Sequence, residues 1–166
     1  MLPEYEEFLK QAKVNKKSII RHAKRFRKMR KAKVDEVIHP LHDAAFEKVD
    51  CLECANCCKT TSPLFTERDI KRISKHLRMT GSQFNQEYLT LDEDQEYVLK
   101  TTPCPFLNDE NYCDIYDVRP KACEEYPHTD QVNQIGILSL TTKNATICPA
   151  VADIFNALAE IEKDLR

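Results

Sequence analysis

The sequence predicts a small, helix-rich α+β domain with at most one small antiparallel sheet. Apolar residues recur at three- and four-residue steps near both ends of the chain, which predicts a long N-terminal helix and a C-terminal helix. Only the runs 96–100 and 135–140 resemble strands, and we expect them to pair antiparallel. Between them, the proline-rich stretch 103–127 predicts irregular loops, because proline fixes φ and disfavours helix before it. A length of 166 residues suits a single domain.

The first 49 residues form a predicted helical flank, and residues 50–166 form the predicted main domain. Pro3 suits a first helical position and His39-Pro40 is an expected stop, so we expect one helix over 3–38 and a shorter one over 40–49. This flank is strongly basic: twelve Lys and Arg residues and no acidic residue lie between positions 10 and 33. They are Lys10, Lys13, Lys16, Lys17, Arg21, Lys24, Arg25, Arg27, Lys28, Arg30, Lys31 and Lys33.

Three further helices are predicted after the flank. Thr66 with Asp69 resembles a capping box that opens a helix ending near Leu77. The run Thr80-Gly81-Ser82 breaks that helix and starts a short one. Pro149 opens a final helix with an apolar face made of Val151, Ile154, Phe155, Leu158, Ile161 and Leu165.

Cysteine is the unusual component of the composition. All eight cysteines lie between positions 51 and 148. The N-terminus is acidic and no apolar run follows it, so we expect no secretory signal and a cytoplasmic location, where thiols stay reduced. We also expect no membrane association, because no run approaches the ~20 apolar residues of a spanning helix. Metal ligation therefore explains the eight thiols better than disulfides do.

The spacing of the cysteines supports metal binding. Cys51, Cys54 and Cys57 follow one another at two-residue gaps, as in the start of a bacterial ferredoxin run. Cys58 is adjacent to Cys57, and two neighbouring residues are difficult to fit on one ion, so we expect them to serve different metals or one of them to bridge. The simplest count is two four-cysteine sites, holding zinc or iron or an iron–sulfur cluster. The predicted metal ligands are Cys51, Cys54, Cys57, Cys58, Cys104, Cys113, Cys123 and Cys148.

Four ordered motifs over roughly residues 50–150 resemble a known family. They are Cys-x-x-Cys-x-x-Cys-Cys from Cys51, Cys-Pro-Phe-Leu from Cys104, Cys-x-Ile-Tyr from Cys113 and Arg-Pro-x-x-Cys-x-x-Tyr-Pro from Arg119. The chain thereby resembles the YkgJ-type cysteine-cluster family, the CxxCxxCC domains described as zinc- or iron-chelating. The resemblance implies metal chelation by the motif cysteines, with Cys148 as their expected late partner. The basic flank lies outside it.

Clustered thiolates need compensating positive charge. Eight thiolates around two divalent ions leave a net charge of about −4, which burial penalises heavily. Lys59, Arg119 and Lys121 lie beside predicted ligands in the sequence. Arg119 is the best candidate for compensation, because a guanidinium offers several directed donors.

Three functional hypotheses follow. The first is a metal-binding protein that acts in metal handling or as an accessory module. The second is an iron–sulfur redox protein that assists a modification enzyme. The third uses zinc only structurally and binds nucleic acid or an acidic protein partner through the basic flank. No Ser/His/Asp order and no glycine-rich phosphate loop is present, so we assign no catalytic or cofactor-binding residues and leave enzymatic activity open.

Overall fold

The structure is a computed structural model that describes residues 1–164, including the side chains of residues 1–159. Contacts between residues group the chain into two compact units. Unit 1 comprises Met1–Cys54 together with the chain from Pro127 onward. Unit 2 comprises Ala55–Tyr126.

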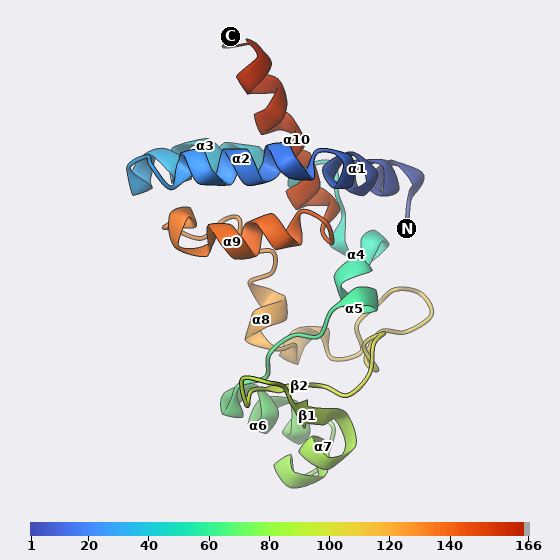
Figure 1. Cartoon of the computed structure of the whole chain (residues 1–166). Coiled ribbons are helices and arrows are strands. Elements are labelled where there is room, and N and C mark those ends of the chain that lie inside the picture. Colours follow the sequence, from blue (N-terminus) through green and yellow to red (C-terminus); the bar gives the residue numbers. More distant parts are fainter. Residues whose placement is uncertain (165–166) are drawn as a thin grey trace. The chain divides into compact units, whose positions relative to one another are not determined.

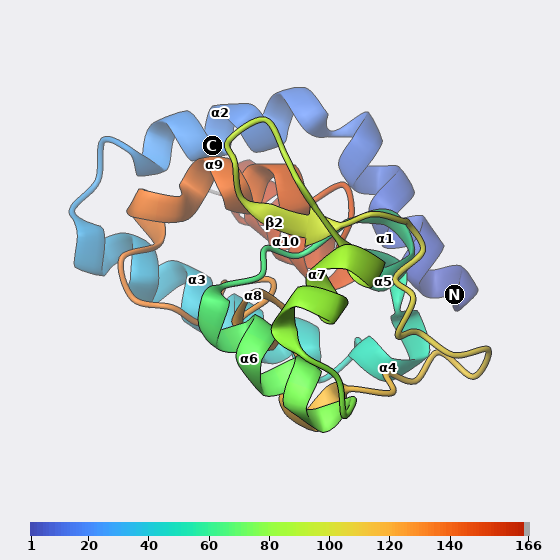
Figure 2. The same cartoon turned by 90° about the horizontal axis from the view of Figure 1, so that it is seen from below.

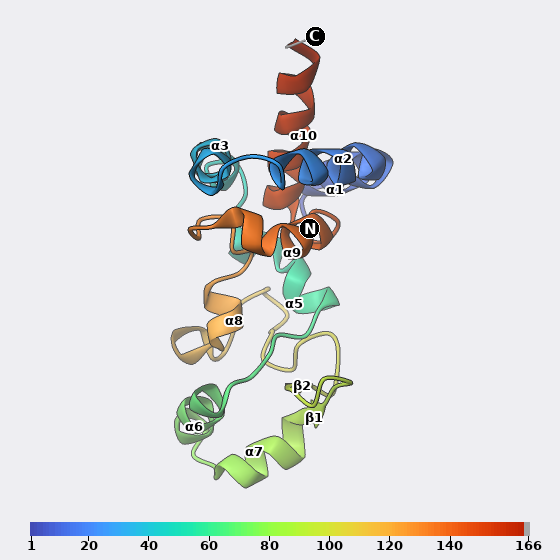
Figure 3. The same cartoon turned by 60° about the vertical axis from the view of Figure 1, so that its left-hand side comes forward.

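Unit 1 is a bundle of helices. The C-terminal helix α10 contacts α1, α2, α3 and α9, and Figure 3 shows it passing between α3 on one side and the α1–α2 pair on the other. Helices α1 and α2 lie nearly end to end (Figure 1). The helices of the unit are α1 (Pro3–Val14), α2 (Lys16–Phe26), α3 (Lys31–Phe46), α4 (Cys51–Cys54), α9 (Gln134–Asn144) and α10 (Pro149–Asp164).

The core of unit 1 forms around the first half of α10. Pro149 opens this helix as predicted, and the four predicted face residues with described side chains are all buried. Ile161 and Leu165, the remaining predicted members, lie outside the described side chains. The helices that contact α10 contribute further buried residues, among them Leu9, Ala12, Ile19, Phe26, Val34, Ile38 and Leu138. Burial of these apolar surfaces is the main stabilising contribution to the unit.

The prediction of one continuous helix over residues 3–38 is wrong. The chain over 3–38 forms three helices, with a kink at Asn15 and a turn at 27–30. Asn is a weak helix former because its side chain competes for backbone hydrogen bonds. The turn lies in a run of neighbouring cations that has no acidic residue between positions 10 and 33. Only a reversal of direction lets α3 bury its apolar residues against α10.

Pro40 does not stop a helix, contrary to the prediction. It lies inside α3. A proline removes the hydrogen bond to the carbonyl four residues earlier, here that of Glu36. Glu36 and Pro40 are both exposed, so water can satisfy the freed carbonyl, and the buried Ile38 and Ala45 hold the helix on the core.

Unit 2 contains short helices and one small sheet. Both predicted N-terminal caps are confirmed: Thr66 and Thr80 each form a complete capping box, with Asp69 and Gln83 respectively. Helices α6 and α7 contact one another and lie side by side in Figure 2. The elements are α5 (Asn56–Thr60), α6 (Glu67–His76), α7 (Gly81–Tyr88), β1 (Leu89–Leu91), β2 (Tyr97–Leu99), the 3₁₀ turn η1 (Tyr116–Val118) and α8 (Lys121–Glu124).

Of the two predicted strands, the one over 96–100 is confirmed and the one over 135–140 is wrong. Strand β2 pairs antiparallel with β1, with Leu89 opposite Leu99. The run 135–140 forms part of helix α9 instead. Its alternating apolar residues resemble a strand, but the carboxylate of Asp35 on α3 accepts hydrogen bonds from the N–H groups of Asn133 and Gln134, both at 2.8 Å, and so caps a helix there.

The apolar core of unit 2 joins its helices to the sheet and to the proline-rich loops. It comprises Phe65, Ile70, Ile73, Phe84, Leu89, Leu99, Phe106 and Ile115. Phe84 and Phe106 stack with their ring centroids 6.2 Å apart. The loop stretch 103–127 is therefore fixed by burial even though it has little regular structure.

The helix-rich α+β class with one two-stranded antiparallel sheet is confirmed. The boundary between a flank of residues 1–49 and a domain of residues 50–166 stays a prediction. Within the described part of the chain, none of the helices combines the length and the apolar character needed to cross a membrane.

Candidate metal centre

The eight predicted ligands all lie in the described part of the chain, where none of them forms a disulfide, and they divide between the two units. The boundary falls inside the first cysteine motif, at Ala55, which adopts a left-handed conformation with φ of 47°. Unit 1 holds Cys51, Cys54 and Cys148, here called the three-thiol group. Unit 2 holds Cys57 and a four-thiol group made of Cys58, Cys104, Cys113 and Cys123.

Helix α5 carries the adjacent pair Cys57 and Cys58. Their Sγ atoms are 4.0 Å apart and share a hydrogen bond. This hydrogen bond lowers the pKa of Cys58 to about 7, helped by the charge of Lys59 and opposed by burial. Within the four-thiol group, Cys58 is therefore the thiol that ionises most readily near neutral pH.

Backbone hydrogen bonds hold the second and third members of the four-thiol group. The N–H of Cys104 donates to the carbonyl of Cys58 at 2.8 Å, which ties this loop to α5. Cys113 forms an antiparallel bridge with Leu107. The side chain of Asn108 accepts from the N–H groups of Glu110 and Tyr112, at 3.0 and 2.9 Å, and closes the turn between Cys104 and Cys113.

The buried carboxylate of Asp69 holds the segment that carries Cys123. Its Oδ1 accepts from the N–H of Lys121, the first residue of α8, at 3.2 Å, and from the guanidinium of Arg72 at 2.7 Å. Arg72 also donates to the carbonyl of Arg119 at 2.7 Å. Asp69 and Arg72 therefore anchor both sides of Pro120, and with it the start of α8, to helix α6.

The thiols of this group are half-buried, and the charge of each thiolate affects the pKa values of its neighbours. Burial raises the pKa of Cys104 to about 11, and the charges of Cys58 and Cys113 add to the shift. Burial likewise raises the pKa of Cys123 to about 12, with contributions from the other three thiols. The pKa of Cys113 is raised for the same reasons. Four thiols from three separate chain segments thus lie within electrostatic range of each other.

Arg119 supplies part of the positive charge that the sequence predicts for this group. Its charge lowers the pKa values of Cys113 and Cys123, against the dominant effect of burial. The guanidinium lies 4.0 Å from the ring centroid of Tyr116 and donates to that residue's carbonyl at 2.8 Å. Lys121, the weaker candidate, forms an ion pair with Glu125 at 3.2 Å.

The three-thiol group of unit 1 has two members on helix α4 and one directly before α10. Cys51 and Cys54 lie one turn apart on α4, and Cys148 directly precedes α10. Burial raises the pKa of Cys148 to about 12, and the charges of Cys51 and Cys54 add to the shift. N–H groups at the start of α10, those of Ala150 and Val151, oppose it by hydrogen bonding to the sulfur.

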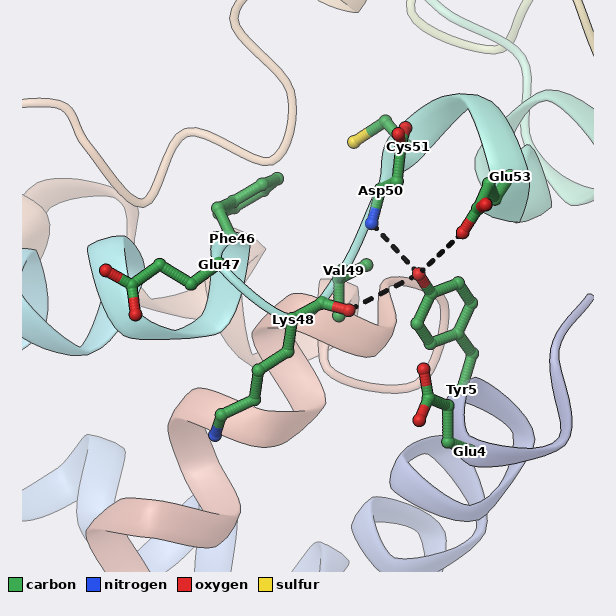
Figure 4. Close-up of a pocket in the computed structure, with 9 residues that line it drawn as sticks. All are labelled: Glu4, Tyr5, Phe46, Glu47, Lys48, Val49, Asp50, Cys51 and Glu53. Atoms are coloured by element: carbon green, nitrogen blue, oxygen red, sulfur yellow. Dashed lines mark hydrogen bonds between the residues drawn. The ribbon is translucent and has the colours of Figure 1, made fainter.

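A hydrogen-bond network around Tyr5 fixes the segment that leads into α4. The buried hydroxyl of Tyr5 accepts from the N–H of Asp50 at 3.0 Å and donates toward Glu53 and the carbonyl of Lys48, both at 3.4 Å. Figure 4 shows these contacts at one side of an open pocket of about 550 Å³, with the Cys51 sulfur directed away from Glu53. Cys51 is exposed at this pocket, whereas Cys54 is buried.

The donor set fits a soft or borderline metal ion. Thiolates are the preferred ligands of zinc and of iron in sulfur sites. Within the part of the chain that the structure describes, no three Cys, His, Asp or Glu side chains lie close enough together to hold an ion as they stand. Thiols with raised pKa values must lose protons and approach one another before they can bind, so metal binding would tighten the loops that carry them.

The sequence did not identify Tyr5 or Asp69 as supports of the cysteine segments. The cap formed by Asp69 was recognisable from its spacing to Thr66, but its bond to Lys121 joins residues 52 positions apart. Tyr5 is 45 positions from Asp50. No local pattern signals contacts over such separations.

Comparison with known proteins places residues 50–149 in one family, described as "putative zinc- or iron-chelating domain". An uncharacterized protein of Methanocaldococcus jannaschii is 31% identical over 94 residues, which cover 55% of this chain and 50% of that protein. The chain thus spans about half the length of this relative. No solved structure matches the chain. Since the family model covers more than half of the sequence, the chain belongs to the family of CxxCxxCC zinc- or iron-chelating domains.

Proposed function

We propose that this protein binds zinc or iron through its cysteines and acts in metal handling or as an accessory module. The observation that carries the proposal is the four-thiol group of unit 2, whose members come from three chain segments and share one electrostatic environment. A chain of a chelating family that gathers four half-buried thiols in this way is suited to hold a metal with all-sulfur coordination. The proposal places the protein in the reducing cytoplasm, where free thiols persist.

Cys58, Cys104, Cys113 and Cys123 are the proposed ligands of one ion. Cys51, Cys54 and Cys148 are proposed to bind a second. Cys57 stays a predicted ligand that is assigned to neither ion. Arg119 would offset part of the negative charge of the first site. When bound, the metal would supply a crosslink between loops that otherwise depend on few apolar contacts.

Metal analysis of the protein purified without oxygen tests this proposal. We expect about two equivalents of metal per chain, and Cys123→Ser should remove about one of them, because a serine hydroxyl is a poor ligand for soft ions. Ala122→Ser is a matched control, since it places the same side chain one residue earlier on the half-buried helix α8. Stoichiometric metal in the control and its loss in Cys123→Ser support the site.

Two results would contradict the proposal. One is wild-type protein that contains no zinc or iron and does not take up either when it is added to the reduced chain. The other is equal metal content in Cys123→Ser and Ala122→Ser, which would exclude Cys123 as a ligand.

The two-residue spacing of Cys51, Cys54 and Cys57 favours an iron–sulfur cluster as the second candidate. In this case the protein would transfer electrons to a modification enzyme. Visible absorbance and acid-labile sulfide in the anaerobic preparation would support it. Colourless protein with zinc and no sulfide would exclude it.

A further inference from the structure

We propose that helix α2 of unit 1 is a binding surface for the phosphate backbone of nucleic acids. The proposal concerns three residues, Lys17, Arg21 and Lys24, here called the basic stripe. None of them is part of the proposed metal sites, and the family match begins at residue 50. The inference therefore goes beyond metal binding.

Helical geometry places the basic stripe on the outer face of α2. Its members are separated by four and three residues, so they project from one side of the helix. The opposite side carries the buried residues Ile19, His22, Ala23 and Phe26. Along the helix axis the three positions extend over about 10 Å, which is long enough to contact several phosphates of one strand. All three side chains are exposed.

Among the described side chains, none neutralises the charge of the stripe. In this basic region, the ion pairs between two described side chains lie at its two ends, Lys10 with Glu7 and Lys33 with Glu36. Within the described residues, no ion pair involves a member of the stripe. Arg21 donates only to the hydroxyl of Ser18, at 3.0 Å. The turn that follows and the first residue of α3 add four more exposed cations, Arg27, Lys28, Arg30 and Lys31.

The local field of α2 is positive although the whole chain has a net charge of −2. Burial lowers the pKa of His22, and the charges of Arg21 and Arg25 lower it further. Residues 34–166 carry 13 basic and 24 acidic side chains, a net of −11. A polyanion is therefore attracted to α2 and repelled by much of the remaining chain, which gives the encounter a preferred orientation.

The form of the surface favours nucleic acid over a membrane or a protein. An amphipathic helix that binds lipid inserts its apolar face, but the apolar face of α2 is already packed on α9 and α10. Protein interfaces have an apolar centre within a polar rim, whereas the one large apolar side chain exposed on α2 is Ile20, at 40%. Repeated cations without an apolar centre match a repeated phosphate chain.

Binding of labelled nucleic acid to the full chain tests the proposal. The probes are a 20-base-pair DNA duplex and a 20-nucleotide single-stranded RNA, both of mixed sequence, titrated by fluorescence anisotropy from 50 to 200 mM KCl. We expect affinity for at least one of them to fall with salt. Lys17→Gln/Arg21→Gln/Lys24→Gln should weaken duplex binding about tenfold or more at 50 mM KCl and reduce the slope of log affinity against log salt by about 2.7, that is 0.9 for each lost phosphate contact.

Unit 2 provides a matched control variant. Arg68, Lys71 and Lys75 are exposed on α6 with nearly the same spacing and the same residue types. Their triple substitution by Gln removes the same total charge and should change affinity less than twofold. Circular dichroism and metal content confirm that each variant is folded and loaded.

Three outcomes would overturn the proposal. The first is no binding of either probe at 50 mM KCl with 100 µM protein. The second is equal weakening by the two triple variants, which would show a response to net charge alone. The third is binding through the stripe to phosphatidylserine vesicles or to poly-glutamate, with neither nucleic acid bound. A difference in affinity between the DNA duplex and the RNA identifies the form of nucleic acid that the stripe prefers.

Discussion

Asp69 shows how one buried side chain can connect distant parts of unit 2. Its carboxylate accepts hydrogen bonds from Thr66, Arg72 and the N–H of Lys121, so a single group caps α6 and fixes the start of α8. Burial opposes ionisation, but these donors prevail and lower the pKa of Asp69. The carboxylate is therefore charged at neutral pH although it is 1% exposed.

Removal of this charge should destabilise the protein in a pH-dependent way. We expect Asp69→Asn to lower the free energy of unfolding by about 2–4 kcal/mol at pH 7, because the amide leaves buried donors poorly paired. A lowered pKa in the folded state contributes stability above the unfolded-state pKa, near 4, and this stability is lost as the pH falls through the folded-state value. The difference between wild type and Asp69→Asn should therefore shrink below about pH 4.

Urea denaturation at a series of pH values measures this effect. Asp109→Asn is the control, since Asp109 is exposed. A constant difference across the pH range, or one equal to that of the control, would contradict the role assigned to Asp69.

At the scale of elements, local patterns predicted caps well and chain reversals poorly. The two capping boxes depend on side chains three residues apart, so their signal is contained in the sequence. The kink at Asn15 and the helix through Pro40 depend on which residues the core of unit 1 must bury. The run 135–140 became a helix because Asp35, about 100 positions earlier in the chain, caps its start.

The cap on α9 leads to a second prediction. Asp35→Ala should lower the free energy of unfolding by about 1–2 kcal/mol, as loss of an N-terminal cap does. Urea denaturation measures the change, and hydrogen exchange should show faster exchange at the first amides of α9. Asp43→Ala is the control, because Asp43 lies on the same helix and is exposed. Equal effects of the two substitutions would show that the contact with α9 contributes nothing.

At the scale of the whole molecule, metal binding should order the loops of unit 2. Its apolar core of eight residues includes only Phe106 and Ile115 from the stretch 103–127. The proposed ligands Cys104, Cys113 and Cys123 all lie in this stretch, so a bound ion would crosslink it to α5.

Metal removal should therefore loosen the loops of the stretch 103–127 before it unfolds the rest of unit 2. After chelation under reducing conditions, we expect hydrogen exchange to increase most over 103–127, and less over α6 and α7, whose buried residues pack on one another. Readdition of zinc should restore protection. Unchanged exchange over 103–127 in protein shown to have lost its metal would contradict a structural role for the ion.

The sequence alone determined the helix-rich class, the caps, the final helix and the family, because each depends on short spacings or ordered motifs. It also identified the thiols as a chemical set. Only the tertiary structure decided that these thiols divide between two units, with five in one and three in the other. The physical reason is that burial and hydrogen bonds between residues 45 and 52 positions apart place the cysteine segments. Contacts over such separations are not signalled by local spacing.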